Sequence, residues 1–249
     1  MDTLDREKIT YEGDDLESLE VMNRYYLWIL EKFSPYLAEG NSCVEFGSGA
    51  GKFSELLFKN VAQLNLVEPS KNLFKKLHEQ YAHNENVELF DMSLEQYVEG
   101  TAFPLHDSAV LVNVLEHIKD DQLALSEIGK VLKPGGYLLL FVPALNMLYS
   151  KFDKKIGHYR RYQKNELESL VSNAGFKVIS NHYCDILGIF PWLVLNKIFG
   201  RTKLDHNLVK LYDNVGVPLT RAIEKMLVPP FGKNLILVAR QSDDNRLAV

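Results

Sequence analysis

The sequence predicts an α/β fold with a mostly parallel sheet that helices cover on both faces. Three features of the printed sequence lead to this fold class. Short apolar runs alternate with segments of helical periodicity, as in repeated strand–helix units. The runs are apolar along nearly their whole length, which is typical of strands buried on both faces. The first run ends in a glycine-rich turn that leads directly into a helix.

Seven apolar runs are expected to be strands, and segments with a 3.6-residue period are expected to be the main helices. The predicted strands are residues 42–46, 64–68, 87–90, 109–113, 137–142, 176–183 and 234–239. The predicted helices are residues 21–37, 52–59, 73–81, 121–132 and 165–174. Pro35, Pro69 and Pro134 mark ends of these elements, because proline lacks the backbone N–H that a helix or a sheet requires.

The length of 249 residues is typical of one large domain or of a domain with an insertion, and we expect a single domain over residues 1–249. Its predicted parts are an acidic mobile arm (1–20), an N-terminal helix (21–39), a core (40–183), a helical insertion (185–231) and a last strand (234–240). The insertion is too long for a routine loop, so it should carry helices of its own.

Composition and charge narrow the class of protein. Hydrophobic residues make up 46% of the chain and charged residues 24%, which is ordinary for a soluble globular protein. Only two cysteines are present, Cys43 and Cys184, so we expect a cytoplasmic protein with neither a disulfide framework nor a metal site. The formal net charge of −5 gives no sign of general nucleic-acid binding. No signal peptide or membrane-spanning run is recognised.

A glycine turn after the first strand is the central motif. Gly47, Gly49 and Gly51 follow Glu45, with Ser48 between the first two glycines. Glycines at these positions let the backbone turn tightly and approach a ligand without a Cβ clash. A plain strand–helix turn is the alternative explanation of the spacing.

Two further acids favour the ligand interpretation. Glu68, followed by Pro69, ends the second strand 23 residues after Glu45. This is close to the offset of roughly 20 residues at which an acid reaches the hydroxyls of a ribose. Asp91 ends the third strand, where it is placed to accept a hydrogen bond from an adenine amino group, with Met92 against the ring. Acids at three consecutive strand ends predict a site for an adenosine-type ligand.

On these residues the sequence resembles the class I, Rossmann-like S-adenosylmethionine-dependent methyltransferases of the small-molecule type. Residues 45–51 are similar to their E/D-x-G-x-G-x-G motif, Glu68 to their ribose acid, and Asp91 with Met92 to their adenine site. Residues 113–118 resemble the fourth-strand segment beside the transferable methyl group, and residues 132–136 resemble the turn before the fifth strand.

The resemblance covers about residues 40–183 and the last strand. It implies a seven-stranded sheet with an antiparallel last strand, S-adenosyl-L-methionine as cofactor and S-adenosyl-L-homocysteine as product. The cofactor-binding residues that it implies are Glu45, Gly47, Ser48, Gly49, Gly51, Glu68, Pro69, Asp91, Met92, Asn113 and Val114. A nicotinamide enzyme is rejected, because the dinucleotide fingerprint G-x-G-x-x-G requires its third glycine one residue after Gly51.

Methyl transfer from a sulfonium depends mainly on alignment, since the leaving group is already activated. A base is needed only where the acceptor must lose a proton, and His117, just past the fourth strand, is the catalytic candidate. The alternative, which we favour until geometry places the ring, is a histidine that only packs at a strand–helix junction.

A basic segment, residues 151–164, follows the fifth strand and contains the candidate acceptor-binding residues His158, Tyr159, Arg160 and Arg161. Arginine forks suit phosphate or carboxylate oxygens. The run is similar to one in small-molecule methyltransferases often encoded with, or fused to, glycosyltransferases of the lipid-phosphate type. That similarity implies a glycan, lipid-linked or otherwise anionic acceptor. A solvated basic loop is the alternative.

The insertion is unusually apolar, and Lys197, Arg201 and Lys203 accompany its apolar run. Four interpretations stay open: a cover for the acceptor pocket, a dimer face, peripheral contact with a membrane through residues 186–203, or ordinary packing on the domain.

The expected function is therefore transfer of a methyl group to a small-molecule, glycan or lipid-linked acceptor. An RNA methyltransferase is one alternative, supported by the basic segment but opposed by the overall acidity. A non-catalytic S-adenosylmethionine-binding protein is the other, because an intact fold does not prove activity.

Overall fold

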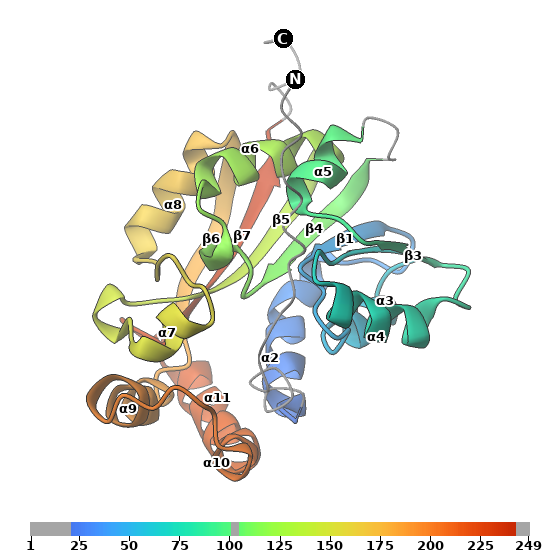
Figure 1. Cartoon of the computed structure of the whole chain (residues 1–249). Helices are drawn as coiled ribbons and strands as arrows, with labels where there is room; N and C mark the ends of the chain where they lie inside the picture. The colour runs from blue at the N-terminus through green and yellow to red at the C-terminus, as the bar shows by residue number, and fades with distance from the viewer. Residues whose placement is uncertain (1–20, 101–104, 243–249) are drawn as a thin grey trace, which may run out of the picture.

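The computed structural model describes residues 21–100 and 105–242. A single twisted sheet forms its centre, and helices cover both faces (Figure 1). The acidic arm expected over residues 1–20 lies outside the described residues.

The sheet has seven strands in the order β3-β2-β1-β4-β5-β7-β6. The strands are β1 (Ser42–Phe46), β2 (Gln63–Val67), β3 (Val87–Phe90), β4 (His106–Val112), β5 (Leu132–Pro143), β6 (Phe176–Cys184) and β7 (Asn234–Gln241). Neighbours among β1 to β5 pair in parallel, whereas β7 is antiparallel to both β5 and β6. The fold class is thus confirmed, including the antiparallel last strand.

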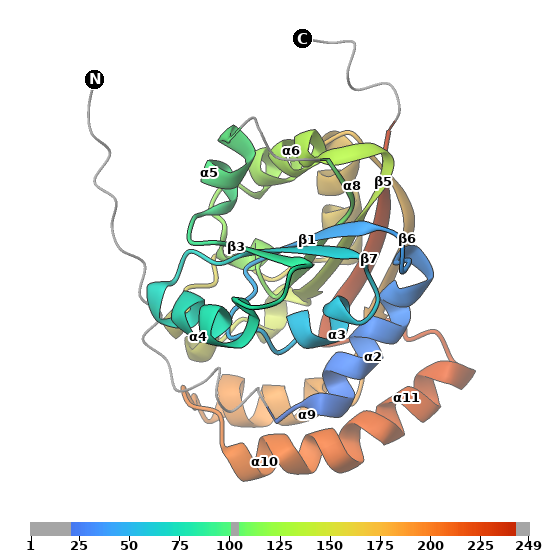
Figure 2. The ribbon, with the colours of Figure 1, turned by 90° about the vertical axis from the view of Figure 1, so that its right-hand side faces the viewer.

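The helices form two layers on the sheet and a third group beside it (Figure 2). One face carries α2 (Asn23–Phe33), α3 (Ser54–Phe58) and α4 (Lys71–Tyr81), and the other carries α5 (Leu94–Glu99), α6 (Asp121–Val131) and α8 (Lys164–Asn173). The insertion is helical, with α9 (Ile189–Trp192), η4 (Leu193–Ile198), α10 (His206–Leu211), η5 (Tyr212–Gly216) and α11 (Val217–Met226). Shorter helical turns are η1 (Ser34–Tyr36), η2 (Leu115–His117), η3 (Asn146–Leu148) and α7 (Lys151–Lys155).

Successive side chains of each central strand point to opposite faces of the sheet, where they join two separate hydrophobic cores. On β5, Leu138 and Leu140 pack toward α6 and α8, whereas Leu139 and Phe141 pack toward α2. All four are essentially buried. This two-sided burial explains why the runs are apolar throughout and not alternating. The two cysteines are free and buried in the core.

The sequence did not predict α5 and α7, which have six and five residues. Each is too short to display a helical period, and each begins at a capping box instead, at Ser93 and Ser150. β4 also begins three residues before the predicted position, at His106.

Two buried aspartates connect the insertion to the rest of the fold. Asp213 in η5 accepts hydrogen bonds from the backbone N–H groups of Arg24 (3.1 Å) and Tyr25 (2.9 Å), so it caps the N-terminus of α2 from a distance. Asp185, directly after β6, accepts from the Tyr25 hydroxyl at 2.9 Å and pairs with Lys233 at 2.8 Å. Side chains from α2, the insertion and the start of β7 thereby meet at one point.

Candidate active site at the carboxyl edge of the sheet

The predicted cofactor residues gather at one edge because the strands before them are in register. Phe46 lies opposite Val67, and Val67 lies opposite Phe90, at the last positions of β1, β2 and β3. The ladder continues one step further, since the Gly47 N–H donates to the Val67 carbonyl at 2.8 Å and the Glu68 N–H donates to the Phe90 carbonyl at 3.0 Å. The glycine turn, Glu68 and Asp91 therefore follow neighbouring strand ends.

The three glycines of the turn are required for different reasons. All have positive φ, between 58° and 84°. A Cβ on Gly47 would lie 2.5 Å from Val114, and one on Gly51 would lie 2.9 Å from Leu77. A Cβ on Gly49 would meet no atom of the described residues within 4 Å. Gly47 and Gly51 thus allow close packing, and Gly49 is the one whose open side is available to a ligand.

Glu68 holds the turn in place. Its Oε2 accepts from the Gly49 N–H and its Oε1 from the Ser70 N–H, both at 2.8 Å. Glu68 is only 5% exposed, and burial raises its pKa above the ordinary value although the two N–H bonds act in the opposite direction. Each carboxylate oxygen keeps a further lone pair. These pairs, next to the open face of Gly49, fit a ligand with two adjacent hydroxyls.

The other predicted cofactor residues surround this point. Asp91 is exposed at the edge, while Met92 and Val114 are half-buried and pack on the core beneath α5 and α6. Asn113 has φ 55°, a conformation uncommon outside glycine, and its N–H donates to the Phe141 carbonyl at 2.8 Å. Pro69 is half-buried beside Glu68. An adenosyl group fits this donor and acceptor set.

Glu45 lies deeper, at 2% exposure, where the Ser54 hydroxyl donates to its Oε2 at 2.5 Å. Burial raises the pKa of Glu45 to about 8, against the opposing effect of this hydrogen bond. Its carboxyl group is therefore buried against the start of α3, the helix that follows the glycine turn.

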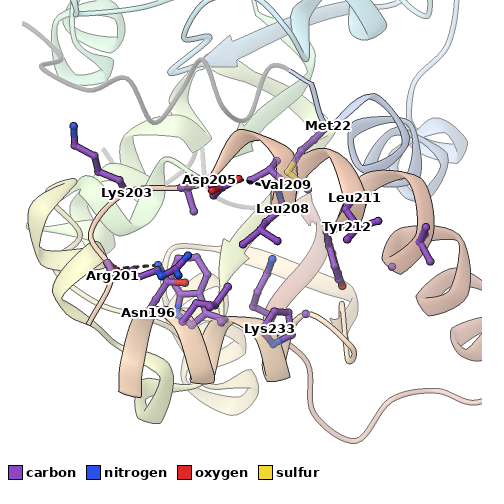
Figure 3. Close-up of a pocket in the computed structure, with 17 residues that line it drawn as sticks. Met22, Asn196, Arg201, Lys203, Asp205, Leu208, Val209, Leu211, Tyr212 and Lys233 are labelled. Atoms are coloured by element: carbon purple, nitrogen blue, oxygen red, sulfur yellow. Dashed lines mark hydrogen bonds between the residues drawn. The ribbon is translucent and has the colours of Figure 1, made fainter. Parts of the chain in front are cut away.

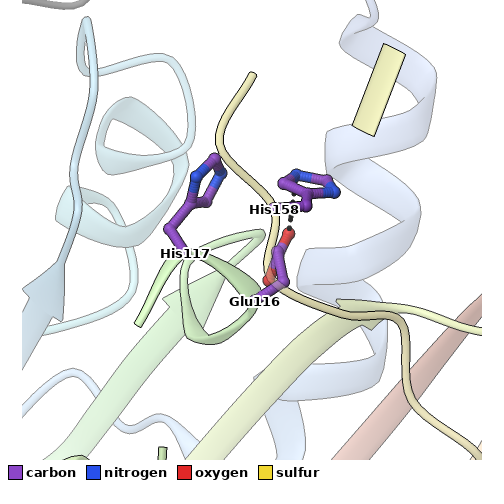
Figure 4. Close-up of side chains that lie close together, drawn as sticks. All are labelled: Glu116, His117 and His158. Carbon is purple, nitrogen blue, oxygen red and sulfur yellow. Dashed lines mark ion pairs between the residues drawn. The ribbon is translucent and has the colours of Figure 1, made fainter. Parts of the chain in front are cut away.

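The segment after β4 meets the basic segment after β5. The Tyr159 N–H donates to the Glu116 carbonyl at 2.8 Å, which lays residues 157–159 beside η2. The rings of His117 and His158 are 4.6 Å apart and nearly perpendicular (Figure 4). Burial and the nearby His158 lower the pKa of His117 to about 4, so its imidazole is neutral at pH 7. The two predicted histidines thus belong to one cluster.

Asp153 organises this cluster. Its Oδ1 lies 3.0 Å from His158 Nδ1 and 2.8 Å from an Arg161 nitrogen, and its Oδ2 accepts from the Ser150 hydroxyl at 2.8 Å. Although burial acts to raise it, these partners hold the pKa of Asp153 down at about 2. On the other side of the ring, Nε2 of His158 lies 3.6 Å from Glu116 Oε1.

The two predicted arginines have partners within the chain. Arg161 is 3% exposed and pairs with Asp153, and its guanidinium carbon lies over the Trp192 ring, 4.6 Å from the ring centre. Arg160 is half-buried and pairs with Asp121 at 2.6 Å. Tyr159 is exposed. Of the predicted acceptor residues, Tyr159 alone presents most of its side chain to solvent.

Sequence reasoning missed Glu116 and Asp153. Glu116 directly precedes His117, so an acid next to the candidate base was a usable signal. Asp153 could be found as the fourth residue of a capping box that starts at Ser150. Its contact with His158 depends on tertiary packing that no local pattern encodes.

The raised pKa of Glu45 gives a testable pH dependence. Between about pH 5 and 8 the folded chain binds the Glu45 proton and the unfolded chain does not, so this group makes stability fall as pH rises, by up to about 1.4 kcal/mol per pH unit. In the variant Glu45→Gln, urea unfolding should lose that part of the slope across this window. Glu55→Gln, an exposed acid on α3, is the matched control and should keep the wild-type slope. Equal slopes in all three proteins would contradict a neutral Glu45.

Comparisons with known proteins show which family and which fold this chain shares. The family described as methyltransferase domain matches residues 19–181. No curated protein matches the chain. Three solved structures illustrate the likeness. The N-methyltransferase NodS of Bradyrhizobium japonicum, in complex with S-adenosyl-L-homocysteine, has a TM-score of 0.60 and 14% identity over 93% of this chain and 94% of that one.

A methyltransferase from Archaeoglobus fulgidus that depends on S-adenosylmethionine has a TM-score of 0.57 and 16% identity, over 88% of this chain and 94% of that one. The [4+2]-cyclase SpnF has the same TM-score and 18% identity, over 88% of this chain and 80% of that one. At these identities the likeness concerns the fold. The family match covers more than half of the residues, and the chain therefore belongs to the methyltransferase-domain family, with the class I fold of the S-adenosylmethionine-dependent enzymes.

Proposed function

We propose that this chain transfers the methyl group of S-adenosylmethionine to a small-molecule acceptor with an apolar portion, presented at a membrane surface. In this proposal residues 1–249 act as one methyltransferase domain, and the insertion binds the acceptor. The observation that carries the acceptor class is an apolar pocket formed by the insertion. The cofactor supplies an activated methyl group, and the residues of the chain bind and orient it.

The carboxyl edge supports the cofactor part of the proposal. Gly49 offers an open backbone face, and Glu68 offers two oxygens already fixed by backbone N–H groups. A group held in advance by hydrogen bonds pays little ordering cost when the ligand arrives. We assign the ribose hydroxyls to Glu68 and the adenine amino group to Asp91.

Glu68 provides the test of the cofactor site. Glu68→Gln keeps the shape of the side chain but removes its charge, so affinity for S-adenosylhomocysteine should fall by roughly 10- to 150-fold, as expected for loss of about 1.5–3 kcal/mol of charge-assisted hydrogen bonding. Isothermal titration measures it. Glu88→Gln, an exposed acid on β3, should bind as the wild type does. Wild-type affinity in a folded Glu68→Gln protein would refute the assignment.

The pocket in the insertion has a volume of about 400 Å³, within the range of small-molecule sites (Figure 3). Apolar side chains such as Trp192, Leu195 and Leu208 line most of it. Its cationic lining residues are Arg201, Lys203 and Lys233. Apolar walls with basic groups suit an acceptor that joins an apolar chain to an anionic group.

The pocket is close to the histidine cluster. Trp192 lines the pocket and stacks on Arg161, which pairs with Asp153, which in turn holds His158. An acceptor with its apolar part in the pocket therefore lies within a few side chains of the carboxyl edge.

The surface of the insertion supports a membrane contact. Eleven of the sixteen large apolar side chains exposed in the described ranges lie between Phe190 and Phe231. Ile198 and Phe199 are 66% and 71% exposed, and Lys197 and Arg201 lie beside them in the sequence. Exposed apolar groups mixed with cations favour the interface of an anionic bilayer. Within residues 21–100 and 105–242, no helix has the length and apolar character needed to cross a bilayer.

A methyl-transfer screen tests the acceptor class. Extracts incubated with enzyme and tritiated S-adenosylmethionine are separated into lipid, polar-metabolite, protein and RNA pools, and counts should appear in the lipid pool. Leu208→Arg, which puts a charge into the pocket, should lower those counts at least tenfold with cofactor affinity unchanged. Leu123→Arg, exposed on α6 away from the insertion and outside the pocket lining, is the control. Counts mainly in RNA or protein would overturn the proposed acceptor.

Vesicle binding tests the membrane contact. The protein should float with vesicles containing phosphatidylglycerol more than with pure phosphatidylcholine. Phe199→Asp should weaken vesicle binding by roughly 10- to 150-fold, since burying a phenyl ring contributes about 1.5–3 kcal/mol. Leu123→Asp, exposed on α6 away from the insertion, should float normally. If the wild type ignores vesicles and forms a dimer that Phe199→Asp dissociates, the insertion is a dimer face instead.

A further inference from the structure

The cluster at Glu116 contains an electrostatic conflict that the proposed function does not use. Glu116 is 0% exposed, and within the described chain neither of its carboxylate oxygens has a hydrogen-bond partner. The nearest nitrogen, His158 Nε2, is 3.6 Å away, which is too far for a hydrogen bond. A buried carboxylate without partners costs several kcal/mol, so a cation or a proton is expected beside it.

The orientation of His158 adds a second unfavourable contact to the buried carboxylate. Its Nδ1 lies 3.0 Å from Asp153 Oδ1, and a carboxylate can only accept, so Nδ1 carries a proton. In a neutral imidazole, Nε2 then presents a lone pair toward the carboxylate of Glu116. Two electron-rich atoms face each other unless a positive charge lies between them. Arg161 is already paired with Asp153 and does not bond to Glu116.

A third donor completes a recognisable ligand set. One ligand atom each from Glu116, His117 and His158 lie within 4.8 Å of one another. Two imidazoles and one carboxylate are a common set for zinc and other divalent first-row metals, with a fourth position left to water or substrate. The bond from His158 to Asp153 repeats the carboxylate–histidine–metal arrangement that fixes a ligating ring.

We propose that Glu116, His117 and His158 bind one divalent transition-metal ion of the zinc type, with Asp153 orienting His158. Ligands on a tetrahedral zinc ion stand about 3.4 Å apart, so the cluster contracts on binding. His117 provides this movement, because it is half-exposed and lies on a short helical turn. The open position accepts an oxygen donor, as expected of a three-ligand site.

The site changes the interpretation of His117. A nitrogen that ligates a metal is not free to accept a proton, so in this proposal His117 is a ligand and not a base. The metal content of the protein can be measured without an assay of methyl transfer. Failure of the metal site therefore leaves the proposed function intact, and failure of the acceptor proposal leaves the metal site intact.

The experiment uses the full chain without a histidine tag, stripped with a chelator and titrated with Zn²⁺. One ion should bind per chain, and Co²⁺ should give the intense visible absorption of a four-coordinate site. His158→Ala and Glu116→Gln should each weaken Zn²⁺ binding at least 100-fold, and Asp153→Asn by 10- to 100-fold. His83→Ala, an exposed histidine after α4, is the control and should bind normally.

Two outcomes overturn the proposal. One is stoichiometric Zn²⁺ binding that survives in folded His158→Ala and Glu116→Gln proteins, which would place the ion elsewhere. The other is the absence of Zn²⁺ binding by the folded wild-type chain. A proton shared between His158 and Glu116 would then resolve the conflict. Glu116→Gln is isosteric and should keep the fold, which circular dichroism checks independently.

Discussion

Burying a carboxylate costs several kcal/mol unless neighbouring groups replace its lost hydration, and this cost determines how the carboxyl edge of the sheet is built. Buried acids lie near the carboxyl ends of five strands that run in the same direction, or on the segments that follow those ends. These acids are Glu45 on β1, Glu68 after β2, Glu116 after β4, Asp153 after β5 and Asp185 after β6. The lost hydration of each acid must be replaced by hydrogen-bond donors or cations on the segments that pack over this edge. The acids therefore help to determine which segments come together there.

The compensations differ, and each one has a structural consequence. Backbone N–H groups satisfy Glu68 and thereby fix the glycine turn. Lys233 and the Tyr25 hydroxyl satisfy Asp185 and attach both the start of β7 and α2 to the end of β6. Arg161 and His158 satisfy Asp153 and order the basic segment. Glu116 is the exception, and the exception marks the position where an external cation completes the set.

The sequence predicts most of the sheet, and physical reasons separate what it predicts from what it does not. The bounds of β1 and β3 are as expected, because apolar runs flanked by glycine or acids are local signals. The edge position of Glu68 and Asp91 follows from parallel register. The short helices α5 and α7 depend on capping boxes within five or six residues, which carry no period.

The arginines illustrate a different limit of sequence reasoning. An adjacent pair of guanidinium groups in a basic run favours an anion site as much as an internal ion pair. Only tertiary structure places Asp153 beside Arg161 and Asp121 beside Arg160. The Arg161 guanidinium is buried over Trp192 and already paired with Asp153, so in the proposed function an anionic group of the acceptor would use other cations, at Arg201 or Lys203 in the pocket.

Buried acids also connect the edge to the insertion, which bears on how the cofactor edge and the proposed acceptor pocket are aligned. Asp185 and Asp213 connect the insertion to α2, and Trp192 connects the pocket wall to Arg161. Methyl transfer requires the acceptor atom to stand in line with the sulfonium, where a displacement of about 1 Å costs on the order of 100-fold in rate. A pocket carried on an independently mobile insertion would not hold that alignment. Buried ion pairs and a stacked guanidinium are directional contacts, so they fix the insertion relative to the cofactor edge more firmly than apolar packing alone.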